Sequence, residues 1–189
     1  MSHSVVLFDA CVLYPASLRD LLMYLAGTGL FQARWTDRIH DEWITNLLKH
    51  QPEINLERLA RTRRKMNEAV LDSLITGYEM LIDTLQLPDA NDRHVLAAAI
   101  HAGASHIITC NLRDFPNDVL APFGIKAVSP DDFLVRLIDE NAEVVLAAVK
   151  RQRTRLKNPP KTVEEYLATL EKQGLFKMVA FLQKHRDDI

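Results

Sequence analysis

Residues 87–116 read LPDANDRHVLAAAIHAGASHIITCNLRDFP, and this stretch decides the fold class. An apolar segment with helical periodicity predicts a helix that Asp89 and Asp92 open and Gly103 ends. The apolar run 106–110 then predicts a strand, and the polar residues Asn111 and Asp114 follow it on a turn. A helix, a strand and a carboxylate-bearing turn in this order are typical of an α/β unit whose polar groups collect at the carboxyl end of a strand.

Two aspartates stand at the start of the predicted helix and allow different interpretations. Asp89 is a good N-cap residue, and capping alone explains it. Asp92 follows three residues later, where an acid favours the helix dipole. However, at helical spacing Asp92 lines up with the apolar positions Val95 and Ala99. A carboxylate at the end of a buried stripe costs free energy unless it is paired or binds a metal, so we favour a functional role for Asp92.

A second polar residue follows the first predicted strand. Ser4 to Phe8 reads SVVLF, a continuous apolar run of the kind that forms a central parallel strand buried on both faces. Asp9 comes directly after it. The end of the first strand of an α/β sheet is a favoured place for a ligand-binding or catalytic residue, although Asp9 could instead cap the next segment.

The remaining pattern predicts an α/β domain over residues 1–133 and an all-helical extension over residues 134–189. Glu42 lies beside the apolar stripe of one predicted helix, where a solvated role is equally compatible with the pattern. Ser129-Pro130 and Thr162 are strong helix starts, and Asn158 to Pro160 predicts a break. The predicted helices are 17–26, 36–49, 55–74, 117–122, 130–149, 163–173 and 175–185, and the further strands are 31–35, 79–85 and 125–128.

Composition bounds the class of protein. The chain has 189 residues, of which 48% are hydrophobic, and a net charge of -2, so it has enough apolar residues for a core and is not a generally basic nucleic-acid binder. Cys11 and Cys110 are the only cysteines, and we expect buried free thiols in a reducing compartment. No signal peptide is recognised and no apolar run approaches about 18 residues, so we expect a soluble cytoplasmic protein without membrane spans.

Basic residues and histidines have simple structural interpretations. The run from Arg58 to Lys65 and the run from Lys150 to Lys157 predict solvated helix surfaces, and the alternative for each is contact with RNA phosphates. The seven histidines show no spacing typical of zinc sites, so we expect them at the surface or at helix caps.

Four acids stand in positions that could form one site: Asp9, Glu42, Asp92 and Asp114. Clustered carboxylates repel and raise each other's pKa values, and a divalent cation removes that cost. Oxygen ligands favour Mg²⁺ or Mn²⁺ over Zn²⁺. A magnesium ion held by acids can activate water and stabilise charge on a phosphate, so the pattern suggests metal-dependent phosphodiester hydrolysis. The chain contains no Gly-rich phosphate loop and no G-x-S-x-G motif.

These motifs together resemble a known family. FDACVLYP, the helix with Glu42, LPDANDRHVLAAAI and ITCNLRDFP resemble PIN-domain ribonucleases of the VapC toxin type over about residues 4 to 133. The resemblance implies a three-layer α/β/α sandwich around a parallel sheet, with acids that bind one or two Mg²⁺ or Mn²⁺ ions and cleave single-stranded or loop RNA. Asp9, Glu42 and Asp92 match the first three acids, and Asp114 stands at the fourth acidic region. Asn111 occupies a neighbouring position where many relatives carry Asp.

The resemblance also implies partners. Toxins of this type pair with an antitoxin protein whose C-terminal segment enters the active-site groove, and they commonly form homodimers. The extension over residues 134–189 resembles that of a longer VapC-like branch, and its basic run could hold RNA or the antitoxin. The unusual Asn111 and this extension leave one alternative, an RNA-binding or protein-interaction module with little catalysis. A further alternative, a DNA-directed or structure-specific nuclease, would use the same site.

Overall fold

The computed structural model describes residues 4–157 and 159–189, and a parallel sheet lies at its centre. The strand order is β3-β2-β1-β4-β5, and every pairing is parallel. The strands are β1 (Val5–Phe8), β2 (Gln32–Thr36), β3 (Leu74–Ile75), β4 (His106–Ile108) and β5 (Lys126–Val128). From β1 the sheet continues through β2 to β3 at one edge, and from β4 it continues to β5 at the other edge. The crevice between the carboxyl ends of these two strands is therefore where an open α/β sheet binds ligands.

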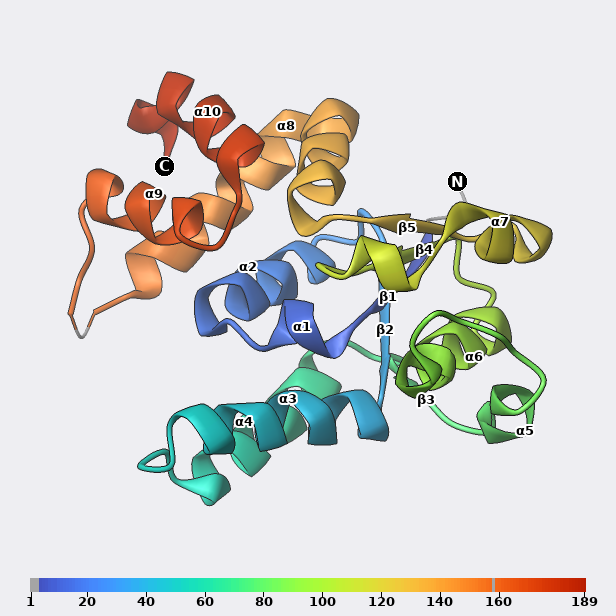
Figure 1. The fold of residues 1–189 in the computed structure, drawn as a ribbon. Helices are drawn as coiled ribbons and strands as arrows, with labels where there is room; N and C mark the ends of the chain where they lie inside the picture. Colours follow the sequence, from blue (N-terminus) through green and yellow to red (C-terminus); the bar gives the residue numbers. More distant parts are fainter. Residues whose placement is uncertain (1–3, 158) are drawn as a thin grey trace.

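Helices flank the sheet, as α1 and α2 lie on one side and α6 on the other (Figure 1). The predicted three-layer α/β/α fold with a helical C-terminal region is confirmed. The helices are α1 (Ala10–Leu13), α2 (Ala16–Ala26), α3 (Asp37–His50), α4 (Leu56–Ala69), α5 (Glu79–Ile82), α6 (Arg93–His101), α7 (Asn117–Leu120), α8 (Pro130–Arg155), α9 (Val163–Glu171) and α10 (Phe176–Lys184). Short 3₁₀ turns are η1 (Ala90–Asp92), η2 (Leu112–Asp114), η3 (Ala121–Phe123) and η4 (Arg186–Asp188).

The core is built on β1, which is buried on both faces. Leu7 and Phe8 are fully buried. The Phe8 ring lies 5.9 Å from the Phe31 ring and 6.2 Å from the Phe133 ring, both edge to face. Because Phe133 belongs to α8, this aromatic cluster ties the start of the C-terminal helices to the central strand.

One predicted strand is wrong. Residues 79–85 were expected to form a strand, but Glu79–Ile82 form the helix α5. The strand on this side of the sheet is β3, whose first residue was expected to end a long helix from Asn55. That helix, α4, ends at Ala69 instead, and Asp72 turns the chain with a positive φ of 58°. The Trp35 amide then donates to the Ser73 carbonyl, so pairing with β2 decides which short apolar run becomes a strand.

The C-terminal helices fold back on the start of α8. The helix α8 is kinked at Asn141, whose side chain accepts a hydrogen bond from the Val144 amide and caps the second half. The Asp131 carboxylate accepts from the amides of Lys177 and Met178 at the beginning of α10. The predicted capping box at Thr162 is present at the start of α9. The predicted break at residues 158–160 begins at a position outside the described residues.

Gln152 joins the C-terminal helices to the sheet domain. Its side chain is almost fully buried between α8, α9 and α2. Its amide nitrogen donates to the Ser17 carbonyl and to the Asp20 carboxylate, each at 3.0 Å, and its oxygen accepts from the Tyr166 hydroxyl at 2.6 Å. One side chain of α8 thus bonds to polar groups of two other helices, α2 and α9.

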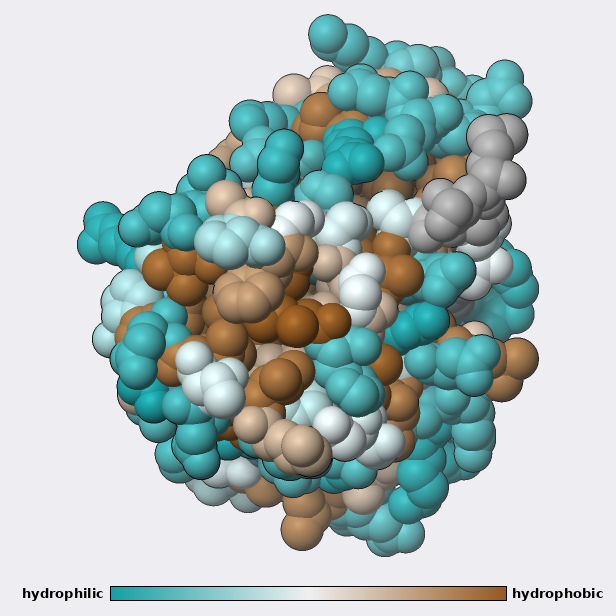
Figure 2. Space-filling view, turned by 90° about the vertical axis from the view of Figure 1, so that its right-hand side faces the viewer, coloured by the Kyte–Doolittle hydropathy of each residue, from teal (hydrophilic) through white to brown (hydrophobic). Residues whose placement is uncertain are grey.

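Apolar surface collects on the face that carries α5 to α7. Figure 2 shows a brown area in the middle of the face on the right of Figure 1, edged by hydrophilic residues. Large apolar side chains are exposed at Met80 in α5, Leu112 in η2 and Phe123 in η3. Such surface is typical of protein contacts.

Within the described residues, no helix has the length and apolar character needed to cross a bilayer.

We predict that Gln152→Ala lowers the free energy of unfolding by about 2–3 kcal/mol, because the buried Tyr166 hydroxyl loses its partner. Urea unfolding measures this loss. The control is Lys150→Ala, at an exposed position of the same helix, which should change stability by less than about 0.5 kcal/mol. Equal stability of the two variants would contradict the anchoring role of Gln152.

Candidate active site

Asp9 is held rigidly at the carboxyl end of β1. It is 4% exposed and caps α1. Its Oδ1 accepts from the Ala10 amide at 2.6 Å, and its Oδ2 accepts from the Thr109 hydroxyl at 2.7 Å and from the Cys11 thiol at 3.1 Å. The capping and site interpretations of Asp9 are therefore compatible: three donors orient the carboxylate at the crevice between β1 and β4.

The end of β4 supplies the other wall of this crevice. The Asp9 amide donates to the Ile108 carbonyl, which continues the pairing of β1 with β4 by one residue. Thr109 is fully buried, and its hydroxyl, which donates to Asp9, accepts from the Asn111 amide at 3.0 Å. Thr109 thus connects the turn that carries Asn111 and Asp114 directly to the Asp9 carboxylate.

Asp92 lies among several like charges. Its pKa is raised from the ordinary 3.8 to about 6, first by burial and then by the charges of Asp9, Asp89 and Asp114, while His94 acts in the opposite direction. Its side chain makes no capping hydrogen bond to α6, whereas Asp89 accepts from the Asn91 amide as a cap. The geometry therefore separates the two aspartates: Asp89 caps, and Asp92 faces other carboxylates at a free-energy cost.

Glu42 reaches this group through His94. Glu42 Oε1 lies 2.8 Å from His94 Nε2, and Arg38 Nε approaches the same oxygen at 3.4 Å. His94 is 1% exposed, and neither ring nitrogen has an aligned hydrogen-bond partner among the described residues. The contact between His94 and Glu42 is therefore a close approach of an imidazole to a carboxylate and not an aligned hydrogen bond. His94 also lowers the pKa of Asp92, so its charge acts on both acids.

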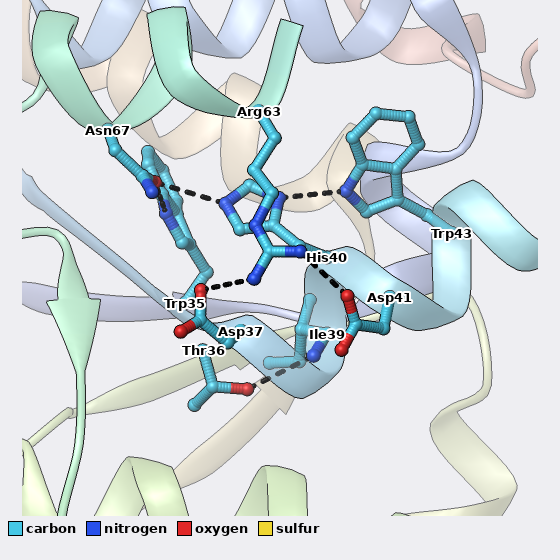
Figure 3. A network of polar contacts seen from close by, with 9 residues as sticks. All are labelled: Trp35, Thr36, Asp37, Ile39, His40, Asp41, Trp43, Arg63 and Asn67. Atoms are coloured by element: carbon cyan, nitrogen blue, oxygen red, sulfur yellow. Dashed lines mark hydrogen bonds and ion pairs between the residues drawn. The ribbon is translucent and has the colours of Figure 1, made fainter. Parts of the chain in front are cut away.

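A buried polar network orients α3, the helix that carries Glu42 (Figure 3). Asn67 of α4 accepts from the Trp35 indole at 2.7 Å and lies 3.0 Å from His40 Nε2. The other ring nitrogen of His40 accepts from the Trp43 indole at 3.0 Å. This arrangement requires a neutral imidazole that donates through Nε2, and burial lowers the pKa of His40 to about 4.

Arg63 adds a charged clamp outside this network. Its guanidinium donates to Asp37 at 2.6 Å and to Asp41 at 2.7 Å, both in the first turns of α3. Figure 3 shows the two carboxylates on either side of the guanidinium. Arg63 was expected with its basic neighbours on a solvated surface or against RNA, but it holds α4 against α3 instead.

Two predictions about burial are wrong. Histidines were expected at the surface or at caps, yet His40 and His94 are almost fully buried. The thiols are free as predicted, but Cys110 is exposed and Cys11 is only partly buried. Cys110 is exposed because β4 ends at Ile108, so the turn that follows the strand carries Cys110 out of the sheet.

The structure places the predicted site residues around one edge of the sheet. Asp92 feels the charges of Asp9 and Asp114, Glu42 contacts His94, whose charge also acts on Asp92, and the Asn111 amide is linked to Asp9 through Thr109. Among residues 4–157 and 159–189, no three His, Cys, Asp or Glu side chains are arranged as a ready metal site. The donor set is nevertheless of the kind that a hard divalent cation prefers, because several carboxylates share an edge where their repulsion is not fully neutralised.

Sequence reasoning missed three residues that touch these acids: Cys11, His94 and Thr109. Cys11 and Thr109 donate to Asp9, and His94 contacts Glu42. Each lies within two residues of a predicted site residue or strand end, which is a signal that the pattern contained. The contacts themselves depend on the pairing of β1 with β4 and on the packing of α3 against α6.

Comparison with known proteins identifies the fold. A family model described as PIN domain matches residues 5–113. The chain belongs to the PIN domain family. A second model, described as VapC50 C-terminal domain, matches residues 130–184, directly after the PIN domain. The predicted resemblance to the longer VapC-like branch is confirmed.

A curated relative of the PIN domain chain is similar over part of its length. The protein named "Putative ribonuclease VapC50", from Mycobacterium tuberculosis (strain ATCC 25618 / H37Rv), is 40% identical over 97 residues. The match covers 51% of this chain and 57% of that relative. No solved structure matches the chain.

We predict that Asn67→Ala lowers the free energy of unfolding by about 2–4 kcal/mol, because two buried donors on Trp35 and His40 lose their acceptor. Urea unfolding followed by tryptophan fluorescence measures the loss. Glu68→Ala, at the next and exposed position of α4, serves as the control and should change stability by less than about 0.5 kcal/mol. A loss no larger than that of the control would show that the network does not stabilise α3.

We predict that Asp92→Asn stabilises the protein in chelator-containing buffer above about pH 6. The pKa of Asp92 in the folded protein, about 6, exceeds its ordinary value, so stability falls as pH rises from about 4 through about 6. Removing the charge should raise Tm by about 2–4 °C near pH 7.5, since Asp92 is only half-buried, and by much less near pH 4.

Scanning fluorimetry over this pH range tests the expectation for Asp92. The matched control is Asp118→Asn on α7, an exposed aspartate outside the cluster, which should show no pH-dependent difference from wild type. A Tm of Asp92→Asn equal to or below that of wild type near pH 7.5 would contradict the electrostatic cost assigned to Asp92.

Proposed function

We propose that this PIN domain chain is a metal-dependent endoribonuclease and the toxin of a toxin–antitoxin pair. The observation that carries the proposal is the position of Asp92, which is surrounded by the charges of Asp9, Asp89 and Asp114 at the carboxyl edge of the sheet. Such a cluster destabilises the protein without a counter-ion, and a bound divalent cation removes that cost.

The proposed metal ligands are Asp9, Glu42, Asp92 and Asp114, with Asn111 positioning a further ligand or water. Mg²⁺ suits this oxygen-only set, and Mn²⁺ can replace it. When bound, the ion supplies an activated water and charge stabilisation at the scissile phosphate. The chain's own contribution is orientation: three donors fix Asp9, and Arg38 and His94 both approach the same oxygen of Glu42.

The substrate we propose is RNA. The name of the curated relative describes a ribonuclease, and this chain is 40% identical to part of it. The two basic segments also favour a polyanion: Arg58, Arg61, Arg64 and Lys65 are exposed on α4, and Lys150, Arg151 and Arg155 are exposed near the end of α8. These cations can contact backbone phosphates while the acids contact the reacting one.

The protein partners we propose are an antitoxin and a second copy of the chain. The exposed side chains of Met80, Leu112 and Phe123 offer apolar area to a protein partner, and Figure 2 shows apolar surface on one face of the molecule. The basic run from Lys150 to Lys157 is an alternative contact for the antitoxin. We further propose that the functional division lies between residues 1–133 and 134–189, and that the protein acts in the cytoplasm.

The test is cleavage of a cellular RNA pool by the purified full chain with Mg²⁺, with Mn²⁺ and with EDTA. We predict metal-dependent cleavage that Asp92→Asn lowers by at least about 100-fold, because losing a ligand removes several kcal/mol of transition-state stabilisation. Asp118→Asn, outside the cluster, should retain full activity. DNA of matched sequence should remain intact.

Two other outcomes would overturn the proposal. Binding of RNA by folded wild type without metal-dependent turnover would show an RNA-binding or interaction module. Equal cleavage by wild type and Asp92→Asn would show that the acids at this edge do not form the catalytic site. A rise in Tm on adding Mg²⁺, present in wild type and absent in Asp92→Asn, would support the metal ligands independently of activity.

A further inference from the structure

The two cysteines of the chain meet beside Asp9. They are 99 residues apart in sequence, yet the Cys110 amide donates to the Cys11 sulfur at 3.1 Å. The Cys11 thiol also lies 3.5 Å from the Thr109 hydroxyl and donates to the Asp9 carboxylate at 3.1 Å. The cysteines therefore flank the crevice from opposite walls, Cys11 after β1 and Cys110 after β4.

The pairing of β1 with β4 places these two residues next to each other. Phe8 pairs with Ile108 in the parallel register, and the Asp9 amide continues the pairing at 3.1 Å from the Ile108 carbonyl. Cys11 and Cys110 follow on these two adjoining segments. Since the Cys11 sulfur already contacts the Cys110 backbone, rotation of the two side chains can bring the sulfurs to bonding distance with little backbone movement.

The two thiols differ in access. Cys110 is exposed on the turn after β4, whereas Cys11 is partly buried at the start of α1. An oxidant in solution therefore reaches Cys110 first, and Cys11 is positioned to react with the product. The sequence contains only these two cysteines, so no third thiol of the chain competes.

We propose that Cys11 and Cys110 form an oxidative modification site that a peroxide converts to an intramolecular disulfide. The Cys110 sulfur attacks one peroxide oxygen, the O–O bond breaks, and Cys110 becomes a sulfenic acid as one water is released. The Cys11 sulfur then attacks the Cys110 sulfur, the S–O bond breaks, and a second water leaves. Two thiols and one hydrogen peroxide thus give one disulfide and two waters.

The disulfide changes the surroundings of Asp9. In the reduced protein, the Cys11 thiol is one of three donors to this carboxylate. A disulfide sulfur carries no hydrogen, so oxidation removes this donor and draws the sulfur towards Cys110. The bond also ties the β1–α1 junction to the turn that carries Asn111. Resting on the proposed function, this predicts weaker Mg²⁺ binding in the oxidised protein, by about 3- to 10-fold, the factor of roughly one weak hydrogen bond.

The experiment treats the full chain with hydrogen peroxide and measures intact mass, free thiols and the mobility on a non-reducing gel. We predict the loss of two hydrogen atoms and of both free thiols, in a monomeric band, reversed by dithiothreitol. Cys110→Ser cannot form the bond and keeps the Cys11 contact with Asp9. Cys11→Ser cannot form it either, but its hydroxyl can still donate to Asp9.

The second readout is the Mg²⁺-dependent rise in Tm, which does not require the substrate. Peroxide should shift the Mg²⁺ titration of wild type to higher concentrations and leave that of Cys110→Ser unchanged. Separate disulfide-linked dimers, or oxidation of Cys110 alone, would overturn the proposed pair. A disulfide with an unchanged Mg²⁺ titration would overturn the link to Asp9. No Mg²⁺ response in the reduced protein would instead contradict the proposed function, while the mass result would still decide the disulfide.

Discussion

The parallel pairing of β1 with β4 is the constraint on which the rest of the molecule depends. It is the point where the strand order reverses, and it brings Asp9 together with Thr109 and the turn beyond it. Both strands are buried, so their register cannot slip without moving apolar side chains out of the core. The register therefore fixes which residues meet at the carboxyl ends of these strands.

Asp92 is placed against its own electrostatic preference. Asp92 has a raised pKa because burial and three carboxylates disfavour its charge, while His94 relieves part of the cost. Asp89 already caps the start of this helical segment, so capping does not explain Asp92. A carboxylate retained at a destabilising position is typical of a functional site, where a ligand rather than the fold compensates the charge.

Two further anchors keep the surrounding helices in place. The network of Trp35, His40, Trp43 and Asn67 sets the direction of α3, and so of Glu42, without using any residue of the proposed site. Gln152 anchors the C-terminal helices to the sheet domain through hydrogen bonds to α2 and α9. In both cases, polar groups from two different elements share one amide side chain, which specifies a single arrangement because any other leaves them unpaired.

The sequence alone determined the central features of the fold. Local periodicity predicts the apolar runs of β1 and β4, and local hydrogen bonding predicts the caps at Ser129 and Thr162. The order of the four acids is read directly from the sequence. These are properties of neighbouring residues, so they can be read along the chain. The placement of Asp92 in line with an apolar stripe also distinguished it from the capping Asp89.

Only the tertiary structure decided which polar residues are buried and what they touch. The burial of His94, the exposure of Cys110, the clamp of Arg63 on α3 and the assignment of β3 rather than residues 79–85 to the sheet all depend on contacts between distant segments. Short apolar runs and single polar side chains carry no local signal strong enough to fix these contacts. They are decided when the strands pair and the helices pack, because burial is a property of the whole fold.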